Sequence, residues 1–127
     1  MYIDPRDLEK VIQAIIVNQA EIQWKPGKAQ PHLAKRIRLG HLPENSTLAD
    51  YEAVIATVTS NRTANVYAYI YDQVIYPTLT AIVADRLWLV MLGINGILET
   101  SFPPDDPKKY LNNSCFVYLG IMEELLQ

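Results

Sequence analysis

The residues best suited to chemistry lie close together, in the stretch KAQPHLAKRIRLGH from Lys28 to His41. This stretch holds both histidines of the chain, and the wider segment from Ile22 to Pro43 holds five basic residues and no acidic one. The chain as a whole is acidic, with 14 aspartates and glutamates against 11 lysines and arginines. A local cluster of positive charge on an acidic chain predicts a site for a specific anion, and argues against a nonspecific nucleic-acid coat.

The residue types in this stretch suit the cleavage of an RNA phosphodiester. Histidine exchanges protons near neutral pH, and arginine offers a fork of donors to phosphate oxygens. His32 and Arg36 are four residues apart, so they share one face of a predicted helix. We expect His32 to act as general acid and base and Arg36 to hold phosphate. The alternative is an exposed basic helix followed by a loop, in which His41 has no assigned role. Further basic residues expected to bind substrate are Lys28, Lys35 and Arg38.

The second distinctive stretch is GILETSFPP, from Gly96 to Pro104. It is typical of a strand end, because Thr100, Ser101 and Phe102 are followed by two prolines. Alternation along a strand places Thr100 and Phe102 on one face and Ser101 on the other. One interpretation is an ordinary polar strand end. The other assigns Thr100 to catalysis, and Ser101 and Phe102 to substrate binding.

The rest of the chain supplies the elements that must position these residues. Apolar residues at intervals of three and four predict helices over 4–23, 32–39 and 48–59. A capping box from Thr47 to Asp50 opens the third helix. Segments rich in Val, Ile, Tyr and Thr predict strands near 65–71, 78–84, 86–92 and 96–102. Asn95-Gly96 predicts a hairpin before the last strand. Residues 107–112 and 114–126 are expected to form closing helices.

This order of elements predicts one α+β domain over residues 1–127, with N-terminal helices, a four-stranded and mainly antiparallel sheet, and C-terminal helices. Half of the residues are hydrophobic and 20% are charged, which is typical of a globular chain. No apolar run approaches the ~18 residues of a membrane span, and the N-terminus lacks the pattern of a signal peptide. We therefore expect a cytoplasmic protein with no membrane partner.

Two further features allow more than one interpretation. VYAYIY places Tyr67, Tyr69 and Tyr71 on one strand face. These rings are expected to pack under a helix, and a stacking platform for single-stranded nucleic acid is the alternative. Cys115, the only cysteine, is expected to be a small buried apolar residue, with a nucleophile as the alternative. Because there is no zinc-binding spacing and no glycine-rich phosphate loop, the sequence predicts neither a metal nor another cofactor.

Taken in order, the segments HLAKRI, LADYEAVI and DRLWLVMLGINGILETSFPP resemble the barnase/EndoU/colicin/RelE-like ribonuclease toxins. Over about residues 30–104, the chain is most similar to RNase A-like toxin domains of contact-dependent inhibition systems and to phage-borne nuclease domains. The resemblance implies a metal-independent ribonuclease that works through a cyclic phosphate. It matches His32 to the catalytic histidine, and Arg36 or Arg38 to the phosphate-binding base. Thr100 matches the threonine of a strand-end motif.

Phe102 departs from that pattern, because the family has a tyrosine at this place. Phe102 can stack on a base but has no hydroxyl, so Ser101 or a tyrosine elsewhere would have to supply one. The partners implied are RNA and a cognate inhibitor protein. The acidic total charge and Phe102 also favour another function, a non-enzymatic interaction module such as an immunity protein or adaptor. Either protein is expected to be a monomer, or a homodimer assembled at the edge of the sheet through the tyrosine-rich strand.

Overall fold

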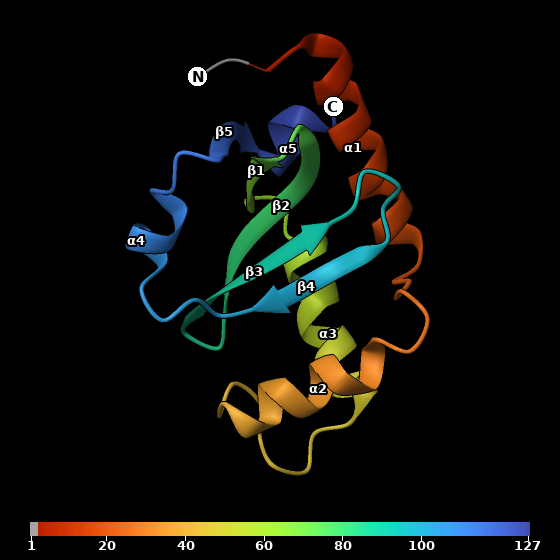
Figure 1. Cartoon of the computed structure of the whole chain (residues 1–127), viewed down its shortest axis with the longest axis vertical. Coiled ribbons are helices and arrows are strands. Elements are labelled where there is room, and N and C mark those ends of the chain that lie inside the picture. Colours follow the sequence, from red (N-terminus) through yellow and green to blue (C-terminus); the bar gives the residue numbers. More distant parts are fainter. Residues whose placement is uncertain (1–2) are drawn as a thin grey trace.

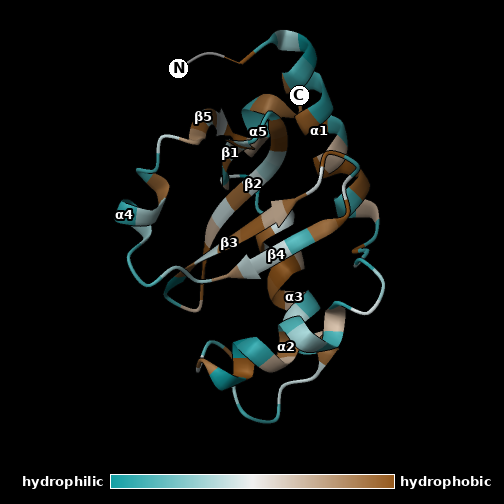
Figure 2. Cartoon of the chain, viewed as in Figure 1, coloured by the Kyte–Doolittle hydropathy of each residue, from teal (hydrophilic) through white to brown (hydrophobic). Residues whose placement is uncertain are grey.

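Three helices come first in the structure, a computed structural model that describes residues 3–127. They are α1 (Pro5–Ala20), α2 (Ala29–Arg38) and α3 (Leu48–Thr59). The Asp4 carboxylate accepts the Arg6 N–H at the start of α1, and Thr47 and Asp50 form the expected capping box of α3. Lys28 precedes α2 and forms no side-chain hydrogen bond that would cap it. Hydrophilic and hydrophobic residues alternate along this helix (Figure 2). None of the helices within residues 3–127 is both long and apolar enough to cross a bilayer.

A five-stranded antiparallel sheet follows, one strand more than expected (Figure 1). The strands are β1 (Asn65–Tyr71), β2 (Val74–Val83), β3 (Arg86–Leu92), β4 (Leu98–Phe102) and β5 (Phe116–Ile121). Their spatial order is β4-β3-β2-β1-β5, so the last strand of the chain pairs with the first. Two short helices, α4 (Pro107–Leu111) and α5 (Met122–Leu125), flank β5 in the chain. The fold is therefore α+β. The three longer helices all precede the sheet in the chain, and the helices that follow β4 are short.

The expected helix over 114–126 is wrong over Phe116–Ile121, which form β5, and only Met122–Leu125 are helical. Its apolar residues fit a helical spacing, but they also alternate, with Val117 buried and Tyr118 54% exposed. Pairing with β1 decides between the two possibilities and sets Tyr118 opposite Tyr67. A helix here would have left the outer edge of β1 unpaired. Because β5 covers that edge, the expected homodimer edge on the tyrosine-rich strand is wrong.

Tight turns join the first three strands, and the sequence gives little sign of them. They are formed by Asp72-Gln73 and Ala84-Asp85, whose φ angles are all positive, between 50° and 67°. Two such residues in succession are the geometry of a type I′ turn, for which Asn-Gly is the usual sequence. Because the first turn lacks that signal, the start of β2 at Val74 was not expected. The hairpin expected at Asn95-Gly96 is confirmed, since β3 and β4 pair antiparallel and Gly96 has φ 86°.

The core lies between the long helices and one face of the sheet. Every second strand residue points into it, such as Val66 from β1, Leu79 from β2 and Val90 from β3. Figure 1 shows α1 and α3 on that side of the strands. The tyrosines of β1 lie on the opposite face, and Tyr71 is 61% exposed. These tyrosines were expected to pack under a helix, and that expectation is wrong for α1 and α3, which cover the other face of the sheet.

Tyr51 joins α3 to the strand that carries the second predicted motif. Its fully buried ring packs against Trp24 and Trp88, with ring centroids 5.6 and 6.4 Å away. Its hydroxyl donates a hydrogen bond to the Ser101 carbonyl in β4. Burial raises the pKa of Tyr51 to about 12, so the hydroxyl keeps its proton at neutral pH. This bond ties the end of β4 to α3.

We predict that Tyr51→Phe lowers the free energy of unfolding by about 1–3 kcal/mol, because the buried Ser101 carbonyl loses its donor. Urea denaturation followed by circular dichroism measures the change. Tyr71→Phe removes the same atom from an exposed ring and is the matched control, with an expected change below about 0.5 kcal/mol. Equal values for the two variants would contradict a stabilising role for the bond.

Candidate functional site

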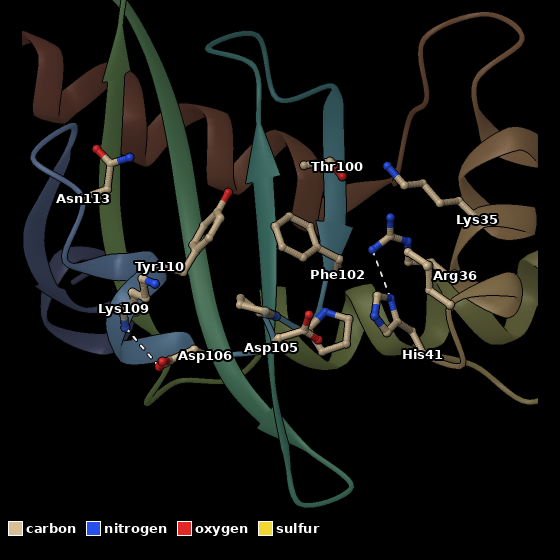
Figure 3. A pocket seen from close by; sticks show the side chains of 13 residues that line it. Lys35, Arg36, His41, Thr100, Phe102, Asp105, Asp106, Lys109, Tyr110 and Asn113 are labelled. Atoms are coloured by element: carbon tan, nitrogen blue, oxygen red, sulfur yellow. Dashed lines mark hydrogen bonds between the residues drawn. The ribbon is translucent and has the colours of Figure 1, made fainter.

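A cleft of about 710 Å³ opens between the end of α2, the end of β4 and the short helix α4. Its walls come from three parts of the chain that are distant in sequence, and Figure 3 shows their side chains converging. The lining includes Lys35, Arg36, His41, Thr100, Phe102 and Tyr110. Basic, hydroxyl and aromatic groups thus face one space.

The end of α2 brings Arg36 and His41 together. The helix stops after Arg38, and Gly40 has φ 74°, in the left-handed region that glycine adopts readily. The chain turns back there, and the His41 N–H donates to the Arg36 carbonyl at 2.8 Å. Beside this bond the side chains meet, with Nη1 of Arg36 3.1 Å from Nδ1 of His41 (Figure 3). A glycine turn therefore places a histidine in the cleft, and sequence reasoning had given that histidine no role.

Arg36 is a buried charge without a carboxylate partner. The residue is 4% exposed, and its Nε is buried and makes no hydrogen bond. None of the ion pairs formed within residues 3–127 involves Arg36. Its guanidinium carbon lies 5.5 Å from the ring centroid of Phe102, a cation–π contact that offsets part of the lost hydration. Buried guanidinium groups are normally paired with a carboxylate, so Arg36 differs from the usual case in lacking one.

His41 is held in its neutral form. Its pKa lies below the ordinary value of 6.5, because the ring is partly buried and because Arg36 and Arg86 are positively charged. Asp105 acts in the opposite direction. Since arginine is only a donor, Nδ1 of His41 carries the lone pair and Nε2 carries the proton. A neutral imidazole beside a guanidinium can accept a proton at neutral pH.

β4 presents alternate residues to the cleft, as strand alternation predicted. Thr100 and Phe102 line the cleft, whereas Ser101 points to the core. Ser101 is fully buried, and its hydroxyl donates to the Leu89 carbonyl at 2.9 Å. The assignment of Ser101 to substrate binding is therefore corrected, because its side chain is on the wrong face of the strand.

The short helix α4 forms the third wall. Asp106 caps it by accepting the Lys109 N–H at 3.2 Å, and Pro107 occupies its first position. This turn brings Lys109 and Tyr110 to the cleft, where the Tyr110 ring meets Phe102 edge-on at 5.5 Å. Burial raises the pKa of Tyr110, and the nearby Tyr69 hydroxyl raises it further. The Tyr110 hydroxyl is therefore protonated at neutral pH. Tyr110 thus adds a protonated tyrosine hydroxyl to the residues that line the cleft, next to Phe102.

His32 does not line the cleft, although it lies one turn before Arg36 on α2. Its ring packs against Trp24 at 5.7 Å, and its Nδ1 is buried without a partner. The pKa of His32 is lowered by burial first, and then by the charges of Arg36, Lys35 and Lys28. The shared helix face was expected correctly, but the tryptophan from the preceding loop covers the imidazole.

The remaining predicted basic residues divide between the cleft and the surface. Lys35 lines the cleft beside Arg36. Lys28 and Arg38 are exposed near the two ends of α2 and are not part of the lining. The cleft thus gathers four of the residues expected from the sequence, which are Lys35, Arg36, Thr100 and Phe102.

The cleft contains no cluster of metal-binding side chains. Within residues 3–127, no group of three or more His, Cys, Asp or Glu residues is arranged to hold a metal ion. A scan against protein-family models, a search of curated proteins and a search of solved structures each found no match. The resemblance to ribonuclease toxins therefore depends on the sequence segments alone.

We predict that Arg36→Met raises the pKa of His41 toward 6.5, because it removes a nearby positive charge. Titration of the imidazole NMR signals measures this pKa. Arg38→Met, which removes an exposed arginine two residues away, should leave the pKa of His41 unchanged. A His41 pKa at or above 6.5 in the unaltered protein would contradict the observed pair.

The two lowered histidine pKa values should also make stability depend on pH. Between the folded and unfolded pKa values, the unfolded chain binds more protons, so unfolding becomes easier as pH falls. We expect this contribution to be complete above about pH 6.5 and to be lost as the pH falls toward the folded values. Urea denaturation between pH 7.5 and 5.5 measures the slope, which should flatten in the double variant His32→Gln/His41→Gln. An unchanged slope would be the contrary result.

Proposed function

We propose that the chain is a metal-independent endoribonuclease and that the cleft around Arg36 binds the scissile phosphate. The observation that carries this proposal is the buried guanidinium without a carboxylate at an open cleft. Lys35 and Lys109 add positive charge to the walls. A phosphodiester would provide the missing anion, and its oxygens match the donors of arginine. The resemblance to ribonuclease toxins supports the same substrate.

In the proposed reaction, the 2′-hydroxyl of RNA attacks the adjacent phosphorus. The bound phosphate attracts the Arg36 guanidinium, which releases the lone pair on Nδ1 of His41. His41 then accepts the 2′-hydroxyl proton, the bond from O2′ to phosphorus forms and the bond from phosphorus to O5′ breaks. Arg36 and Lys35 stabilise the negative charge of the phosphorane. The products are a 2′,3′-cyclic phosphate and a 5′-hydroxyl end.

The departing 5′ oxygen takes its proton from Tyr110 on the facing wall. This hydroxyl is protonated at neutral pH, as a general acid must be. Phe102 lies between Arg36 and Tyr110, where its ring can stack on the base next to the phosphate. Thr100 lines the same wall and shapes the pocket. The role first expected of His32 passes to His41, because His41 is the histidine in the cleft.

Incubation of purified protein with mixed RNA in EDTA tests this function. We expect cleavage that leaves cyclic phosphate ends and rises with pH through an apparent pKa below 6.5, since only neutral His41 accepts the proton. His41→Ala and Arg36→Met should each lower the rate by about 10²–10³.

His32→Ala is the matched control, because it removes the other imidazole from outside the cleft. We expect it to reduce cleavage less than about tenfold, well under the effect of losing a general base. A greater loss with His32→Ala than with His41→Ala would contradict the assignment, and no cleavage under any condition would contradict the function.

One observation favours the non-enzymatic alternative. The exposed carboxylates of Asp105 and Asp106 lie at the cleft, where they would repel RNA and attract a basic protein. A pull-down that returns one stoichiometric protein, together with no cleavage of RNA, would select the interaction module. The buried guanidinium makes the ribonuclease the better supported proposal.

A further inference from the structure

A series of aromatic rings leads from the cleft across the sheet face that the long helices leave open. We call it the aromatic track, and it consists of Phe102, Tyr110, Phe116, Tyr69, Tyr67 and Tyr118. Centroids of contacting rings are between 4.7 and 5.9 Å apart. We infer that the track stacks the bases of single-stranded RNA whose phosphate occupies the cleft. This inference rests on the proposed function and specifies the form of its substrate.

Strand pairing builds the track. Tyr67 and Tyr69 of β1 stand opposite Tyr118 and Phe116 of β5, so aromatic residues alternate with core residues on both strands. Tyr110 of α4 contacts Phe116 at 5.7 Å and connects these strands to the cleft. The pairing of β5 with β1, which the sequence did not predict, therefore extends the row of tyrosines on β1 into a wider aromatic surface.

The exposure of these rings distinguishes them from core residues. Tyr118 is 54% exposed and Tyr110 is 38% exposed, whereas Val66 and Ala68 on the other face of β1 are fully buried. Tyr71, also exposed, stacks almost parallel to Tyr69 at 6.3 Å and widens the track. The other four rings of the track, Phe102, Phe116, Tyr67 and Tyr69, are half-buried. The track is therefore a contiguous and partly exposed aromatic surface, and such a surface marks a place where a partner binds.

The charges around the track fit a nucleic acid. Strands β1, β2 and β5 contain no charged residue, so none of them places a carboxylate beside the rings. At the cleft end lie the cations Arg36, Lys35 and Lys109, together with the carboxylates of Asp105 and Asp106, so the three positive charges exceed the two negative ones there. A single strand presents both phosphates for these cations and unpaired bases for the rings, whereas the bases of a duplex are already stacked on each other.

Fluorescence anisotropy with 2′-O-methyl oligonucleotides tests the inference, because a blocked 2′ oxygen prevents cleavage. The probes are a dinucleotide, a ten-nucleotide strand, the same strand without bases, and a ten-base-pair duplex. We expect the ten-nucleotide strand to bind most tightly, and Tyr118→Leu to weaken that binding at least about fivefold. Tyr118→Phe retains the ring and should retain the affinity.

Ile82→Ala is the matched control, since Ile82 is another exposed apolar residue on the same face of the sheet but outside the track. It should leave binding of every probe unchanged. The 2′-O-methyl dinucleotide should bind Tyr118→Leu as it binds the unaltered protein, because Tyr118 is not part of the cleft lining.

Two results would overturn the track while leaving the ribonuclease in place. One is a Tyr118→Leu variant that cleaves RNA and binds the ten-nucleotide strand as tightly as the unaltered protein. The other is a dimer, measured by light scattering, that Tyr118→Leu converts to a monomer, which would make this face a self-association surface. Failure of every probe to bind, together with no cleavage, would overturn both proposals.

Discussion

A guanidinium that is buried without a carboxylate partner organises the cleft and the elements around it. Removing an arginine from water costs several kcal/mol unless other groups replace the lost hydration. Here the Phe102 ring and Nδ1 of His41 replace part of it. Both contacts depend on the surrounding elements. The turn at Gly40 brings His41 back to α2, and the hydrogen bond from the Tyr51 hydroxyl fixes the end of β4, which carries Phe102. The hydration that is still missing is what a phosphate oxygen would provide.

Most of the fold could be predicted because local patterns mark its elements. The capping box at Thr47 and the Asn95-Gly96 hairpin are set by residues close together in the chain. β5 could not be predicted in this way, since its apolar residues fit two periods and only its pairing with β1 selects the strand. The turn at Asp72-Gln73 also escaped prediction, because neither residue favours a positive φ as strongly as glycine.

The site could be predicted only where short-range geometry determines it. Strand alternation correctly placed Thr100 and Phe102 on the same face. Helical spacing placed His32 on the side of the arginine, but it could not show that a tryptophan from the preceding loop covers the ring. The position of His41 beside Arg36 depends on the turn after α2. The position of Tyr110 depends on the contact between its ring and Phe116 of β5. Neither follows from a motif.

Titration of the protein with inorganic phosphate, followed by NMR at constant ionic strength, measures whether the cleft binds an anion. The structure predicts saturable shifts of the Arg36 Nε–H and His41 imidazole signals, and their loss in Arg36→Met. Chloride at the same ionic strength should not reproduce them. If phosphate and chloride move only the signals of exposed lysines, and by equal amounts, the buried guanidinium is not an anion site and the proposed function loses its basis.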